Sequence, residues 1–99
     1  MKICYRARAL EDVQAIYNWR VRQSSDIAKK VEATVFAAVD WLGEHPEFGT
    51  KTDEPNVRRW PMTDFHCTIF YVLGRDVETI DVLRIVDSKR VRNLKRVPR

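Results

Sequence analysis

The side chains best suited to chemistry are cations. Arg58 and Arg59 stand together in the segment VRRWP, Arg84 lies in the apolar segment VLRIV, and a dense cationic run follows. Residues 84–99 carry seven Lys and Arg against one acidic residue, a net charge of +6, which leaves −2 for residues 1–83. Fixed guanidinium and ammonium groups bind phosphate and carboxylate. This asymmetry predicts an anionic partner, either nucleic acid or an acidic protein. The predicted target-binding or phosphate-contacting residues are Arg58, Arg59, Arg84, Lys89, Arg90, Arg92, Lys95 and Arg96.

Groups that could relay protons are scarce. The two histidines, His45 and His66, lie at a predicted helix end and strand start, where structural roles are favoured, and no aromatic residue or histidine follows Tyr71. Arginine stays protonated and is a poor general base, and Lys89 or Lys95 would need strong desolvation to serve. Glycine-rich phosphate loops, metal-ligand spacings and nucleophile elbows are lacking in the sequence, so no catalytic residue, cofactor or metal is expected. The pattern favours binding over catalysis.

Arg84 carries a further requirement. A guanidinium inside an apolar strand is costly to bury unless it is paired. Arg84 therefore needs a carboxylate or an anionic ligand, and Asp81 and Asp87 are the local candidates among the carboxylates.

The tryptophans can pack or bind. Trp41 widens the apolar face of a predicted helix, which favours packing, and Trp60 alternates with Arg59 and should point inward. Base stacking by Trp19, Trp41 and Trp60 is the less favoured alternative.

The apolar periodicity indicates the elements that position these residues. A strand is predicted over Ile3–Arg8, followed by a helix from Ala9 to about Gln23 in which Glu11 and Asp12 occupy the first turn and favour the helix dipole. A second helix is expected from the N-cap segment Ser24–Asp26 to Gly43, with a stripe at Ile27, Val31, Val35, Ala38 and Leu42. Residues 45–56 look like turns, and strands are predicted over 57–61, 65–73 and 77–86.

This order predicts an α+β fold, β–α–α–β–β–β, in which a helical hairpin packs on one face of a small twisted antiparallel sheet. Ninety-nine residues fit a single domain, 1–99, with a basic C-terminal segment, 84–99. The apolar runs are too short for a membrane span, and the charged N-terminus does not fit a secretory leader. The expected location is the cytoplasm, where Cys4 and Cys67 would be small buried thiols.

Four short motifs around these elements resemble a known family. They are the turn Pro46–Gly49, the strand Val57–Trp60, the segment Ile69–Tyr71 and the ending Leu83–Arg90. In their order and spacing the chain resembles the RelE/ParE toxin superfamily, on the ParE side, over nearly its whole length. The tail RVRNLKRVPR is longer and more basic than that resemblance requires.

The resemblance implies a toxin of a type II toxin–antitoxin module. A cognate, ParD-like antitoxin would wrap the toxin in a hetero-oligomer, and Trp19, Trp41, Arg84 and Arg90 are the expected antitoxin contacts. ParE-like members block DNA gyrase without cutting nucleic acid, and this function is favoured here because the proton relay is missing. The alternatives are a RelE-like ribosome-dependent mRNA endoribonuclease, with Arg58, Arg84, Lys89 and Arg90 on the phosphate, and a basic binding module without toxicity.

Overall fold

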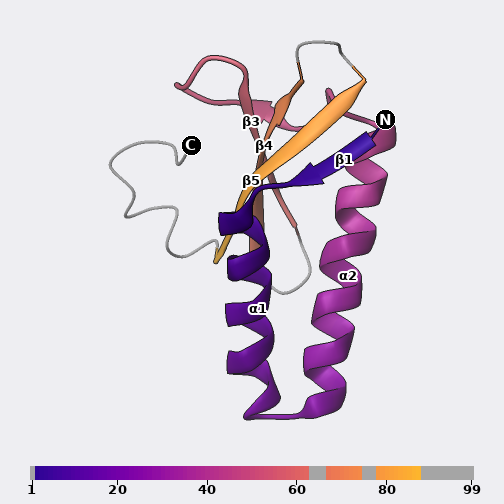
Figure 1. Ribbon diagram of the computed structural model, residues 1–99, viewed down its shortest axis with the longest axis vertical. Coiled ribbons are helices and arrows are strands. Elements are labelled where there is room, and N and C mark those ends of the chain that lie inside the picture. The colour runs from indigo at the N-terminus through magenta and orange to yellow at the C-terminus, as the bar shows by residue number, and fades with distance from the viewer. Residues whose placement is uncertain (1, 63–66, 75–77, 88–99) are drawn as a thin grey trace.

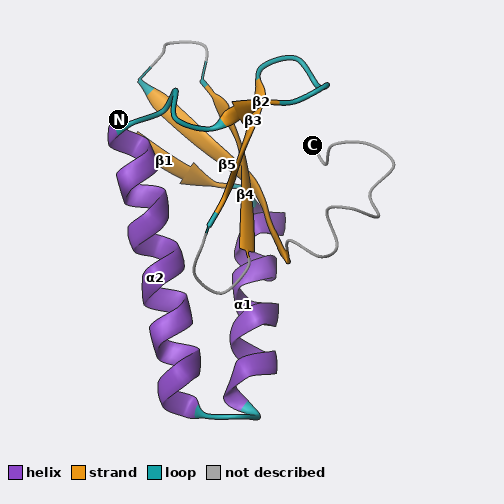
Figure 2. Cartoon of the chain, turned by 180° about the vertical axis from the view of Figure 1, so that it is seen from behind, coloured by secondary structure: helices purple, strands orange, loops and turns teal. Residues whose placement is uncertain are grey.

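The molecule has two layers, a pair of helices and a five-stranded sheet (Figure 1). The computed structural model describes residues 2–62, 67–74 and 78–87. The elements in chain order are β1 (Lys2–Tyr5), α1 (Ala7–Val21), α2 (Ser25–Glu44), β2 (Thr50–Lys51), β3 (Val57–Pro61), β4 (Cys67–Leu73) and β5 (Thr79–Asp87). Seen from behind (Figure 2), α1 and α2 run antiparallel, and the turn that joins them lies at the opposite end of the molecule from β2. The predicted α+β class and helical hairpin are confirmed.

The sheet is mixed rather than wholly antiparallel, with strand order β1-β5-β4-β3-β2. β2, β3, β4 and β5 pair antiparallel, but β1 pairs parallel with β5, with Lys2 opposite Thr79 and Tyr5 opposite Val82. The prediction of an antiparallel sheet was therefore wrong for its first strand. Parallel neighbours need a long crossover, and here nearly the whole chain lies between the paired strands, so no local sequence signal marks the pairing.

Several element boundaries also differ from the prediction. β1 ends at Tyr5 because Arg6, with φ −67° and ψ 151°, is the N-cap of α1, and α1 then begins at Ala7. Glu11 and Asp12 consequently lie beyond the first turn, where they do not act on the helix dipole as predicted. The two residues of β2 fall inside the segment predicted as turns, because two residues are too few to show an alternating pattern.

α2 begins where the cap chemistry predicted. The Ser24 hydroxyl accepts a hydrogen bond from the Ile27 backbone N–H at 3.3 Å, which satisfies one free donor of the first turn. The buried stripe is rotated relative to the prediction, since Ile27 is 43% exposed and Ala28 is fully buried in its place. The stripe consists of Ala28, Val31, Val35, Val39 and Leu42.

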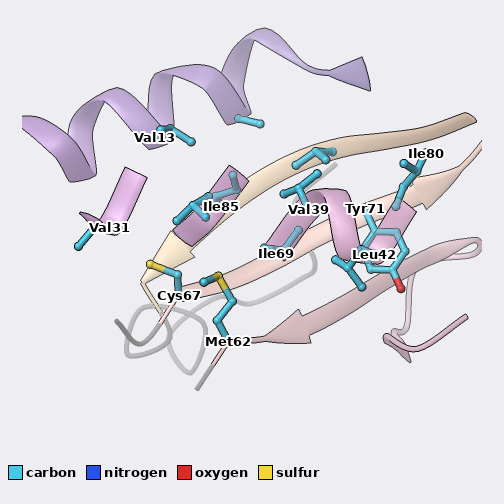
Figure 3. Close-up of a cluster of buried hydrophobic side chains, with 13 residues drawn as sticks. Val13, Val31, Val39, Leu42, Met62, Cys67, Ile69, Tyr71, Ile80 and Ile85 are labelled. Carbon is cyan, nitrogen blue, oxygen red and sulfur yellow. The ribbon is translucent and has the colours of Figure 1, made fainter. Parts of the chain in front are cut away.

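The core lies between this stripe and the helix-facing side of the sheet (Figure 3). Ile69, Tyr71, Ile80, Val82 and Ile85 meet the helices there and are at most 1% exposed. The alternate side chains of β3, β4 and β5 form a second buried cluster, made of Val57, Phe70, Leu83 and Val86. β4 is therefore apolar on both faces, and its sequence, CTIFYVL, is a nearly continuous apolar run. Within the described residues, neither helix has the length and apolarity needed to span a bilayer.

One buried hydroxyl fixes the turn between α2 and β2. The Tyr71 hydroxyl donates to the Pro46 carbonyl at 2.8 Å and accepts from the Gly49 N–H at 2.9 Å. Arg58, opposite Tyr71 in the sheet register, donates to the carbonyls of Glu47 at 3.2 Å and Gly49 at 2.8 Å. A Cβ on Gly49 would lie 2.8 Å and 2.9 Å from ring carbons Cε1 and Cζ of Tyr71 and would clash with its hydroxyl. Gly49 is thus required for space.

Gly49→Ala should lower the free energy of unfolding by about 1–3 kcal/mol, because the new methyl must displace a fully buried ring. Tyr71→Phe should cost about 1–3 kcal/mol, since it leaves the buried Gly49 N–H without its acceptor. Urea unfolding of both single variants and the double variant tests the shared contact. The alanine should cost less in the Tyr71→Phe background, because the clashing hydroxyl is gone. Strictly additive costs would contradict this arrangement.

Candidate functional site

Arg84 is paired with an acid that lies far away in the sequence. Its Nε donates to Oδ2 of Asp12 at 2.7 Å and its Nη2 donates to Oδ1 at 3.0 Å, a two-pronged contact between β5 and α1. The two side chains are 21% and 12% exposed, so solvent screens the pair weakly. The hydrogen bond to Asp12 raises the pKa of the Arg84 guanidinium, which is therefore cationic at every physiological pH.

Arg84 has a carboxylate partner, one of the two kinds of partner expected, but this carboxylate, Asp12, is not one of the two local candidates. Asp81 instead lies 3.6 Å from Arg6, and the side chain of Asp87 lies outside the described residues. Asp12 was missed because it is 72 residues from Arg84 in the sequence. A signal was nevertheless present, since Asp12 lies three residues after Ala9 and next to Val13, both of which are buried. An acid on the buried stripe of a helix needs a partner.

The topology explains why Asp12 reaches this strand. β1 stops pairing with β5 at Val82, where Arg6 donates its N–H to the Val82 carbonyl, and the chain then turns into α1. Beyond that point Oδ2 of Asp12 accepts the Ile85 N–H at 3.0 Å. β1 ends before it could pair with Ile85, and the Asp12 carboxylate accepts the Ile85 N–H in place of a strand partner.

A shift in the register between β4 and β5 moves Arg84 out of the row of core side chains. Phe70 pairs with Arg84 but Tyr71 pairs with Val82, so Leu83 has no residue opposite it. Val82 and Ile85 both belong to the helix-facing core, and the irregularity between them lets Arg84 leave that row. Bulges of this kind commonly redirect one side chain.

Arg58 and Arg59, the two other predicted contacts that lie in the described sheet, differ in availability. Arg58 is partly buried, and its Nη1 is bonded to the carbonyls of the turn. Arg59 is exposed on the opposite face, next to Phe70 in the register. The remaining predicted contacts, Lys89, Arg90, Arg92, Lys95 and Arg96, lie outside the described residues, as does His66.

The tryptophans occupy different parts of the hairpin. Trp19 is 55% exposed near the end of α1, with the Arg20 guanidinium carbon 4.9 Å from its ring centroid. Trp41 is 36% exposed near the end of α2, so the favoured packing role is only partly correct. It stacks on Trp60, which packs against the core as predicted. His45 and Phe48, which the sequence did not single out as binding residues, complete this aromatic group.

Tyr71 is committed to structure. Burial raises the pKa of its hydroxyl, an effect only partly offset by the Gly49 hydrogen bond and the nearby Arg58 charge. The hydroxyl therefore stays neutral, and both its donor and its acceptor functions are used by the turn. Among the described residues, no three His, Cys, Asp or Glu side chains are grouped so as to hold a metal ion.

Two solved structures with a similar fold come from toxin–antitoxin systems. The chain is similar to a protein of the chromosomal ParDE toxin–antitoxin system from P. aeruginosa, with a TM-score of 0.76 and 21% identity, over 88% of this chain and 95% of that one. It is also similar to E. coli toxin RelE, solved as a double arginine-to-alanine mutant with an antitoxin RelB peptide. That match has a TM-score of 0.52 and 14% identity, over 97% of this chain and 96% of that one.

The family follows from the sequence match. Residues 3–92 match the family described as ParE toxin of type II toxin-antitoxin system, parDE. The chain therefore belongs to the ParE toxin family. No curated protein shows significant sequence similarity to it.

Asp12→Asn should lower the free energy of unfolding by about 2–4 kcal/mol, because the Arg84 guanidinium would stay in a mostly buried place without its counter-charge. Glu11→Gln is the matched control. Glu11 is 69% exposed and lies 3.8 Å from the exposed Arg8, so its loss should be within about 0.5 kcal/mol of neutral. Thermal and urea unfolding of both variants measure the difference, and equal stabilities would contradict the role given to Asp12.

Proposed function

We propose that this ParE-family toxin inhibits growth by binding its target, DNA gyrase, through the cationic segment 84–99, without cutting nucleic acid. A cognate antitoxin neutralises it, and both act in the cytoplasm. The observation that favours binding over cleavage is the state of Arg84, which is held by Asp12 within the protein.

This state argues against a phosphate-cleaving role. Arg58 and Arg84 are two of the four residues that the nuclease alternative places on a phosphate. The Arg58 Nη1 is used by two carbonyls, and the Arg84 guanidinium faces a carboxylate that repels phosphate. RNA cleavage through the 2′-hydroxyl also needs a base and an acid near the phosphate. Tyr71, a neutral phenol bound on both sides by the turn, is poorly placed to supply either.

The nuclease alternative still has one observation in its favour. The fold also matches RelE, at a TM-score of 0.52, and Lys89 and Arg90 lie close in the sequence to Arg84. A ribosome-dependent mRNA endoribonuclease therefore remains the second candidate, and its signature is transcripts with new 5′ ends.

Inhibition of gyrase is the direct test. Purified protein should lower supercoiling of relaxed plasmid by gyrase, and its expression should leave transcript ends unchanged. The triple variant K89A/R90A/R92A should inhibit less while its melting temperature stays within about 1 °C, because these residues follow Val86, the last core residue of β5, in the sequence. Full gyrase activity in the presence of the protein, or transcripts cut at defined codons, would contradict the proposal.

The proposed antitoxin contacts define the shape of the partner. α1 and α2 are antiparallel, so Trp19 and Trp41, each near the C-terminal end of its helix, lie toward opposite ends of the hairpin. At 1.5 Å per residue they are separated by roughly 20–25 Å along the hairpin axis. A partner that covers both must be elongated. This suits an antitoxin segment that wraps the toxin, and RelE has been solved with an antitoxin peptide.

Trp19→Ala and Trp41→Ala should each weaken antitoxin binding by roughly tenfold or more, since exposed tryptophans commonly anchor interfaces. Their effects on stability should differ. Trp19 contributes little to the core, whereas Trp41→Ala should cost about 1–3 kcal/mol because its ring is about two-thirds covered. Calorimetric titration with the antitoxin encoded beside this chain, together with unfolding of the free toxin, measures both. Unchanged affinity for both variants would remove these residues from the interface.

A further inference from the structure

An aromatic cluster closes one end of the helical hairpin. It consists of Trp41, His45, Phe48 and Trp60, drawn from α2, the following turn and β3. The indole of Trp41 stacks on His45 at 4.1 Å between ring centroids and on Trp60 at 5.2 Å. Phe48 meets Trp41 and Trp60 edge-on, at 4.8 Å and 6.2 Å. The rings form one continuous surface.

The cluster is rigid as well as exposed. Trp60 packs against the core, the His45 Nδ1 lies 3.0 Å from the Trp41 carbonyl, and Tyr71 and Arg58 tie down the turn that carries Phe48. Phe48 nevertheless remains 63% exposed. Large rings held in place yet left in water commonly mark a binding surface, because no ordering cost remains for the partner to overcome.

A hollow beside the cluster gives this surface a charge preference. The hollow has a volume of about 410 Å³ and is lined by Glu44, His45, Pro46, Glu47 and Phe48. Both glutamates are exposed, and neither Lys nor Arg is among the described lining residues. The Arg58 Nη1 instead donates to the carbonyls of Glu47 and Gly49. The negative end of the α2 dipole also lies here.

We propose that this acidic aromatic hollow binds an arginine side chain of the antitoxin. The inference rests on the proposed function and adds the chemistry of one contact. Carboxylates and the faces of aromatic rings both attract cations. Arginine fits better than lysine, because its planar guanidinium can stack on Phe48 or His45 while donating in parallel to Glu44 or Glu47. An acidic antitoxin segment that opposes the cationic tail would therefore carry a basic residue where it reaches Trp41.

The probe is a capped tripeptide, acetyl-Leu-Arg-Leu-amide, compared with the same peptide containing citrulline, which keeps the shape but lacks the charge. In two-dimensional NMR of the whole protein, the arginine peptide should shift the ring resonances of His45 and Phe48 in a saturable way at millimolar concentration. The citrulline peptide should give no saturable shift. Equal binding of the two peptides, or shifts that avoid these rings, would overturn the proposal.

The test variant is E44Q/E47Q, and the matched control E11Q/E32Q removes the same charge from other parts of the helices. The test variant should bind the arginine peptide and the antitoxin about five- to tenfold more weakly, with a flatter salt dependence, and the control should match the unmodified protein. Equal affinities of the two variants would overturn the arginine contact.

The two proposals can fail separately. If Trp41→Ala weakens antitoxin binding but the arginine peptide does not bind the protein, the hollow is rejected as an arginine site and the antitoxin interface is kept. Saturable peptide binding together with an antitoxin that neither binds nor neutralises the protein would reject the proposed function, and with it the assignment of the arginine to the antitoxin.

Discussion

The contact between Asp12 and β5 is the constraint on which the arrangement of the two layers depends. One carboxylate accepts two guanidinium donors from Arg84 and the backbone N–H of Ile85. It therefore binds α1 to the strand that lies between β1 and β4 in the sheet. A buried carboxylate without these donors would carry an uncompensated desolvation cost. Few positions of α1 relative to β5 are therefore stable. Arg84 is cationic, but its guanidinium is bound by Asp12, so its first role is to join β5 to α1.

A second constraint lies at the C-terminal end of α2, where a tyrosine and an arginine bind backbone groups. Tyr71 and Arg58 hold the backbone of the turn from Pro46 to Gly49 by four hydrogen bonds. The proline–glycine turn, the arginine strand and the tyrosine strand are therefore physically linked in this chain. Each part satisfies polar groups of another, and none would be stable alone in a buried site. The cost is that Arg58, one of the predicted phosphate contacts, and the Tyr71 hydroxyl have already used these donors and acceptors.

The sequence predicted the elements well and the long-range contacts poorly. Periodicity and cap chemistry located both helices and β3, β4 and β5 to within a few residues, since these signals are local. The parallel pairing of β1, the two-residue β2 and the partner of Arg84 all depend on residues brought together only by the fold. The candidate site likewise has a part that the sequence predicted and a part that it did not. Arginine-rich segments and exposed tryptophans could be recognised by type, but the aromatic cluster required α2, a turn and β3 to meet, and Phe48 alone gives no sign of it.

The distribution of charge then explains how one small toxin could serve two partners. Segment 84–99 has a net charge of +6 by sequence, whereas Glu44 at the end of α2 and Glu47 in the following turn line the hollow beside Phe48. A target that recognises the cationic segment would be repelled from the acidic end, so the two surfaces discriminate between partners by sign. An antitoxin that spans the hairpin can be complementary to both only if its own charge changes sign along its length. Neutralisation would then depend on a match of charge pattern over an extended segment, which a target with a uniformly acidic surface cannot imitate.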